Sequence, residues 1–136
     1  MGKYTALHDD LYSIFGGAGW IAEGIPSFPD NYTNSANLSE FIRIAILASS
    51  GTYVNIPRSA AGQLIIDIFV PAGQGLKRLN QIADRLDVFL AGKSVATALG
   101  GNTQLGVSAL SPVGVDSANP SLYRGSYSIS FNYFGN

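Results

Sequence analysis

The chain has 136 residues and a formal net charge of −1 at pH 7. This length fits one domain, residues 1–136, with a core large enough to fold without covalent staples. The sequence contains no cysteine, which excludes a disulfide scaffold, a thiolate metal site and a cysteine nucleophile. The near-neutral charge argues against a surface adapted as a whole to nucleic acid or to an anionic membrane.

Charged side chains are scarce in this sequence. Asp, Glu, Lys and Arg make up 12% of the residues, against roughly 25% in a typical globular domain. The surface must therefore be built largely from small polar residues and from the seven tyrosines. Because interface cores are depleted in Lys, Glu and Asp and enriched in Tyr, the composition favours a subunit of a larger assembly. A monomer with a polar surface is the alternative.

No membrane or export signal is visible in the sequence. No apolar run approaches the roughly 18 residues that suggest a membrane span, and residues 1–6 lack the apolar core of a signal peptide. We therefore expect no membrane partner, and a protein that is made and used in the cytoplasm.

The N-terminal region predicts a helix followed by a long irregular segment. Apolar residues recur on one face of a helix over residues 3–15, and Gly16-Gly17 ends it. Residues 16–40 are rich in Gly, Pro, Ser and Asn, and long loops in compact domains are functional or disordered. Large apolar side chains argue against disorder here, and we expect them to fix the segment to the body or to a neighbouring subunit: Trp20, Ile21, Ile25, Phe28 and Tyr32.

Two apolar runs predict a β-hairpin with a long tip. Residues 41–49 form one strand and residues 62–70 the other, joined by a tip of roughly residues 50–61. Arg43 and Asp67 each interrupt an otherwise apolar strand. They can pair across the sheet, line a subunit interface or line a channel, and the sequence leaves these three possibilities open.

The second half predicts a helix and two more strands. Residues 75–90 carry an apolar stripe opposite a charged face that includes Arg78, Asp84, Arg85 and Asp87. A third strand is expected at about 104–110, then a turn-rich segment at 111–121, then a strand in which aromatic and aliphatic residues alternate with small polar ones up to Tyr133. The expected fold is α+β, with a mixed or antiparallel sheet of about four strands flanked by two helices.

Three patterns that could carry chemistry are better explained by structure. Gly73-Gln74-Gly75 lies between a strand and a helix, but the third small position of a dinucleotide fingerprint falls on Arg78. His8, the single histidine, sits beside the apolar stripe of the first helix and predicts a solvated face. Asp84 and Asp87 predict ordinary charge pairing on a helix surface. We therefore expect no catalytic residue, no cofactor and no metal, and hence no enzyme.

The order of motifs over residues 38–134 resembles the tail terminator proteins of long-tailed bacteriophages, the family of the lambda-type minor tail protein U. Each motif is a packing or turn feature, and their order and spacing carry the resemblance. The motifs are Phe41-Ile42-Arg43, then Phe69-Val70-Pro71 with Gly73, then Ile82-Ala83-Asp84 and Phe89 in the helix, then Tyr123-Arg124 and the terminal Ser128-Ile129-Ser130-Phe131-Asn132-Tyr133.

The resemblance implies a virion protein at the head-proximal end of the tail, assembled in the host cytoplasm as a homohexameric ring. The ring caps the tail tube, stops its polymerisation and offers a surface to the head-side connector or neck protein, while DNA passes through the lumen without specific binding. The family brings no catalytic residues. Contacts are expected at the hairpin tip, in segment 111–121 and at charged strand residues, namely Arg43, Tyr53, Asn55, Arg58, Asp67, Asp116 and Arg124.

Two other functions fit the same residues. One is another component of the head–tail junction, such as a head-completion or connector-stopper protein. The other, from a different class, is a small-molecule or nucleotide-binding domain that uses the 71–78 turn or the Trp20 segment.

Overall fold

The computed structural model describes residues 2–31, 33, 37–49, 59–96 and 101–135. Its elements follow the chain in the order α1 (Lys3–Phe15), α2 (Ala18–Ile21), β1 (Ser27–Pro29), β2 (Phe41–Ser49), β3 (Ser59–Pro71), α3 (Lys77–Leu90), β4 (Ser94–Val95), β5 (Asn102–Val115) and β6 (Leu122–Phe134). The α+β class, the first helix and the strand at 41–49 agree with the sequence-based expectation. The helix expected at residues 75–90 is α3, and it begins two residues later than expected, because Leu76 is its N-cap.

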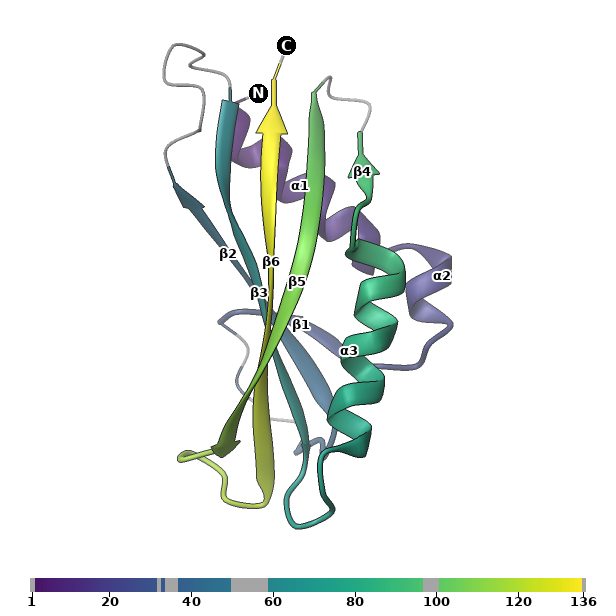
Figure 1. Ribbon diagram of the computed structural model, residues 1–136, viewed down its shortest axis with the longest axis vertical. Helices are drawn as coiled ribbons and strands as arrows, with labels where there is room; N and C mark the ends of the chain where they lie inside the picture. Colours follow the sequence, from purple (N-terminus) through teal and green to yellow (C-terminus); the bar gives the residue numbers. More distant parts are fainter. Residues whose placement is uncertain (1, 32, 34–36, 50–58, 97–100, 136) are drawn as a thin grey trace.

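The strands form a single twisted sheet in the order β1-β2-β3-β6-β5-β4. All neighbours are antiparallel except β1 and β2, which are parallel. Figure 1 shows the long strands β3, β5 and β6 running the length of the molecule. The sheet has six strands, four of them long, so the expectation of about four strands is roughly compatible with the structure but less precise. The two additional strands, β1 and β4, have only three and two residues, too few to show an alternating pattern.

The expected turn segment at 111–121 was wrong in its first half. β5 continues to Val115, and only the residues after it turn toward β6. Pro112 and Gly114 are turn-forming residue types, but here they lie at an irregularity of the strand, where the register with β6 shifts. Proline is tolerated on an edge strand or at a bulge. The location of Pro112 at such an irregularity explains why β5 continues beyond this residue.

Both long helices pack on the same face of the sheet. Figure 1 shows α1 against the upper half of the strands and α3 beside the lower half. Leu7 and Leu11 of α1 and Leu79 and Leu86 of α3 are at most 2% exposed, and they belong to one core with the inward residues of β2, β3 and β6. Full burial of one such side chain contributes roughly 1.5–3 kcal/mol, so the contact between the helix stripes and the sheet is a large contribution to stability.

The segment between α1 and β2 is fixed to the body, as expected for its aromatic residues. Trp20 is 2% exposed and meets the rings of Phe15 and Phe89 edge-on. Its indole N–H donates to the Ser27 hydroxyl over 2.8 Å, which ties α2 to β1. Ile21 does not share this role, because 63% of it is exposed. Tyr32 lies outside the described residues.

Candidate functional site

The predicted contact residues fall into two groups. Arg43, Asp67 and Arg124 lie on the sheet face opposite the helices, and Asp116 follows the end of β5. Tyr53, Asn55 and Arg58, with most of the expected hairpin tip, lie outside the described residues. The described part of the candidate surface is therefore the open face of the sheet and its β5–β6 end.

Arg43 and Asp67 form an ion pair. They are direct register partners of β2 and β3, and the Arg43 Nη2 donates to Asp67 Oδ2 over 3.2 Å. The guanidinium carbon also lies 5.1 Å from the centre of the Phe69 ring, which adds a cation–π contact. Of the three possibilities left open by the sequence, cross-strand pairing is observed. Because both side chains remain more than a fifth exposed, the pair can still meet a neighbour.

A small aromatic cluster closes one end of the open face. Phe41 stacks on Phe69 with ring centres 4.5 Å apart, and Phe28 meets Phe41 edge-on. Leu122 completes the buried cluster, and Leu38 packs against it. The cluster holds the chain before β2 across the sheet, which confirms the expected anchoring role of Phe28.

Asp116 and Arg124 line one small depression at the β5–β6 end. The depression has a volume of ≈ 110 Å³ and is otherwise formed by Val113, Gly114, Val115 and Ser117. The Asp116 N–H donates to the carbonyl of Leu122 over 2.9 Å, so the backbone beneath the depression is fixed. Its small size suits a contact point for another protein better than a small-molecule pocket, since ligand pockets measure roughly 300–1,000 Å³.

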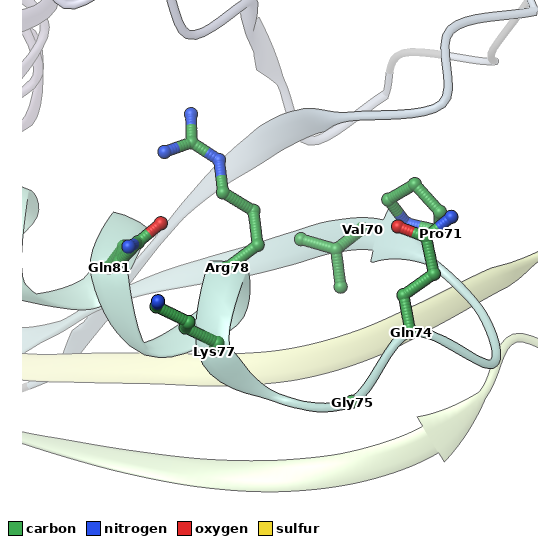
Figure 2. Close-up of a pocket in the computed structure, with 7 residues that line it drawn as sticks. All are labelled: Val70, Pro71, Gln74, Gly75, Lys77, Arg78 and Gln81. Atoms are coloured by element: carbon green, nitrogen blue, oxygen red, sulfur yellow. The ribbon is translucent and has the colours of Figure 1, made fainter.

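A larger depression lies at the turn between β3 and α3. Figure 2 shows its lining, and the volume is ≈ 330 Å³. Gly73 and Gly75 have φ angles of 81° and 78°, in the region that favours glycine, so both glycines serve the reversal of the chain. Arg78 points away from the turn (Figure 2) and donates to both carboxylate oxygens of Glu40, with Nη2–Oε2 at 2.9 Å.

Arg78, which the sequence placed on the charged face of the helix, is thus engaged in an ion pair within the chain. Arg85 is similarly engaged, since it donates to both carboxylate oxygens of Glu23. This contact lowers the pKa of the Glu23 carboxyl from its usual value. The two arginines of the α3 surface therefore bind the segments before β1 and β2 to the helix.

Asp87 is not part of the solvated face that the sequence predicted. Its Oδ1 accepts hydrogen bonds from the Ser108 hydroxyl and the Tyr127 hydroxyl, each over 2.6 Å. These contacts tie α3 to β5 and β6. Burial, reinforced by the hydrogen bond to Asp87, raises the pKa of the Tyr127 phenol from its ordinary value of 10.0. Asp87 lies four residues after Ala83 and three before Leu90, so helical periodicity already places it beside the buried stripe.

A second polar contact inside the core escaped the sequence analysis. Asp10 of α1 is 1% exposed and accepts a hydrogen bond from Thr103 of β5 over 2.8 Å. Its position three residues after Leu7 was the available signal. His8, in contrast, is on an exposed face as predicted, where its side chain is 57% exposed and its ring stacks on Tyr12.

The part of the chain that the structure describes contains no group of three or more His, Cys, Asp or Glu side chains that could hold a metal ion. None of the helices in that part is long and apolar enough to cross a membrane.

Comparison with known proteins gives a likeness of fold. No family model matches the chain, and no curated protein matches it significantly in sequence. Among solved structures, a chain of the virion of a native gene transfer agent particle superposes with a TM-score of 0.70 at 13% identity, covering 97% of both chains. Another solved chain, whose name describes no function, gives a TM-score of 0.63 at 13% identity and covers 98% of this chain and 94% of its own length. The fold is thus shared over nearly the whole chain.

Proposed function

We propose that this chain is a structural subunit of a phage-like virion and acts as a tail terminator. In this proposal six copies form a ring at the head-proximal end of the tail. The ring caps the tail tube, stops its polymerisation and presents its other side to the head-side connector. DNA passes through the lumen without specific binding. The role is architectural and needs no catalysis.

The observation that carries this proposal is the end-to-end likeness to a chain from a gene transfer agent virion, with 97% coverage of each chain. The likeness itself is one of fold. Two features of this chain support the step from a shared fold to a role in an assembly. One is the low charged fraction of 12%, and the other is the use of Arg43, Arg78 and Arg85 in contacts within the chain. A surface with few free cations suits protein contact better than binding to phosphates.

The direct test is electron microscopy of purified protein mixed with tail tubes, polymerised from the tube protein that the same genome encodes. A terminator decorates one end of each tube and stops its lengthening. Tubes that stay bare and continue to grow would contradict the proposal. Binding to the head-side connector without binding to tubes would instead identify a head-completion or stopper protein.

A matched pair of variants locates the contact. Arg124→Glu changes the charge at the β5–β6 depression, whereas Lys77→Glu makes the same change at an exposed position on α3. If the depression touches the tube or the connector, the first variant weakens that contact and the second does not. Equal effects of the two variants would remove the β5–β6 end from the contact surface.

A further inference from the structure

The outer edge of β5 is a strand edge that is open over much of its length. β4 pairs with β5 only at Thr103 and Gln104, and no other described strand lies beyond it. Two shifts of the register with β6, after Leu105 and after Pro112, bound a regular segment at residues 108–112. This segment presents its backbone edge to the surroundings.

The β5 edge lacks the charges that usually protect such a strand. Edge strands in soluble proteins are shielded from pairing by lysines, inward charges, prolines or bulges. Residues 102–115 contain no charged side chain, and Val107, Val113 and Val115 are 85%, 51% and 58% exposed. Pro112 and the two register shifts shorten the open edge without placing a charge on it.

The other side of the sheet has a comparable edge. β1 covers β2 only at Ile42, Arg43 and Ile44. Residues 45–49 have no strand partner besides β3 among the described residues. This segment also contains no charged residue, and Leu47 in its middle is 58% exposed.

The alternation of an antiparallel ladder determines which backbone groups point outward. On β2, the Ile42 N–H donates to Pro26 and the Ile44 carbonyl accepts from the Tyr12 hydroxyl. Both groups lie on the side away from β3, so Ile46 and Ala48 continue that outward series.

On β6, the carbonyl of Leu122 accepts from the Asp116 N–H, so the even-numbered residues of β6 face β5. Their partners between the two register shifts are Ala109 and Ser111. Ser108 and Leu110 therefore direct their backbone groups outward.

We propose that residues 108–111 of β5 pair with residues 45–48 of β2 in a second copy of this chain. This inference rests on the proposed ring and identifies the surface that closes it. One chain carries both edges at opposite sides of one sheet, as a head-to-tail contact requires. Between β2 and β5 the strand direction reverses three times. A rotation about an axis along the strands therefore makes the new pair antiparallel.

One register satisfies the backbone groups of both edges. Placing Ile46 opposite Leu110 also places Ala48 opposite Ser108, which gives two hydrogen-bonded pairs. Shifting by two residues in one direction brings Ile46 opposite Pro112, which has no N–H. Shifting the other way brings Ala48 opposite Gly106, whose carbonyl already accepts from Gly92.

The same register matches apolar side chains on both faces. Ile46 and Leu110 are partly buried and pack against the helix-side core of their own chain, so their pairing extends that core across the contact. On the open face, Leu47 meets Ala109, and both are exposed in the single chain. Cross-strand apolar pairs of this kind stabilise a ladder.

Cysteine cross-linking tests this pairing directly, because the chain has no cysteine of its own. Leu47 and Ala109 form the non-hydrogen-bonded pair of the proposed ladder, with Cα atoms about 4.5 Å apart, a separation that a disulfide can bridge. Chains carrying Leu47→Cys are mixed with chains carrying Ala109→Cys under mild oxidation at high concentration, and the disulfide-linked dimer is measured on a non-reducing gel.

The control replaces Leu47→Cys by Val88→Cys, which is also exposed but lies on α3. The expected 47–109 dimer forms roughly tenfold faster than the control dimer, because pairing raises the effective concentration of the two thiols. A chain with both substitutions gives a ladder of oligomers. Equal rates for the two mixtures would overturn the proposal, as would a dominant 109–109 dimer, which indicates a symmetric β5–β5 contact.

Tube capping by the wild-type protein is measured separately, so the two failures are distinguishable. Capped tubes without the 47–109 cross-link leave the terminator role standing and remove the edge pairing. A cross-link without capping supports edge-to-edge assembly and removes the terminator role on which the ring was based.

Discussion

Replacing Asp87 by alanine should lower the free energy of unfolding by about 1–5 kcal/mol. The carboxylate accepts two hydrogen bonds, from Ser108 and Tyr127, each of 2.6 Å. A hydrogen bond to a charged group contributes roughly 1.5–3 kcal/mol, so the two bonds give about 3–6 kcal/mol. Alanine recovers about 1–2 kcal/mol of this, because it has the higher helix propensity and removes a negative charge near the helix C-terminus.

Asp84→Ala is the matched control for this experiment. Asp84 is exposed on the same helix, and its substitution brings similar gains in propensity and charge without breaking the contacts to β5 and β6. The difference between the two variants therefore isolates the Asp87 hydrogen bonds. Urea unfolding can be followed by the fluorescence of Trp20, the single tryptophan, which is 2% exposed. If both variants unfold with equal free energies, Asp87 does not join α3 to the sheet as described.

Stability should fall as the pH rises above about 10, because the raised pKa of Tyr127 means that folding favours the protonated phenol, and Tyr127→Phe should reduce this loss in urea titrations at successive pH values. Arg43→Ala should cost about 1 kcal/mol or less, and a double-mutant cycle with Asp67→Ala should return a coupling of that size, since the pair is partly exposed. Trp20→Ala should cost about 3–5 kcal/mol in calorimetry, whereas Ile21→Ala, at a site 63% exposed, should stay within about 0.5 kcal/mol.

The elements that could be predicted from the sequence are those with one face fully buried. The β2 boundaries, Phe41–Ser49, agree with the expected strand. The run is easy to delimit because polar or small residues flank it directly on both sides. Leu7, Leu11 and Phe15 recur at helical spacing and are all buried. In each case the burial that stabilises the element also produces the periodic pattern.

The short strands β1 and β4, which were not predicted, and the second half of β5, which was predicted as a turn, lack that pattern for a physical reason. From Val107 onward the residues of β5 are exposed or only partly buried, so its apolar residues no longer mark one buried face. β1 has three residues and is defined by pairing with β2, a contact distant in sequence. Asp87 was assigned to the charged surface of the helix, and Asp10 was not singled out. Residue type alone does not reveal a hydrogen-bond partner in another element.

For the candidate contact surface, composition predicted that contacts exist, and only the fold shows where they can lie. The charged fraction of 12% predicted extensive protein contact but could not locate it. In the folded chain, Arg78 and Arg85 pair with Glu40 and Glu23 on the helix side, while residues 45–49 and 102–115 carry no charge. An uncharged strand edge has a cost in a protein that stays alone, because it invites unwanted pairing. Two such edges on opposite sides of one sheet become an advantage when the intended partner is the next copy of the same chain.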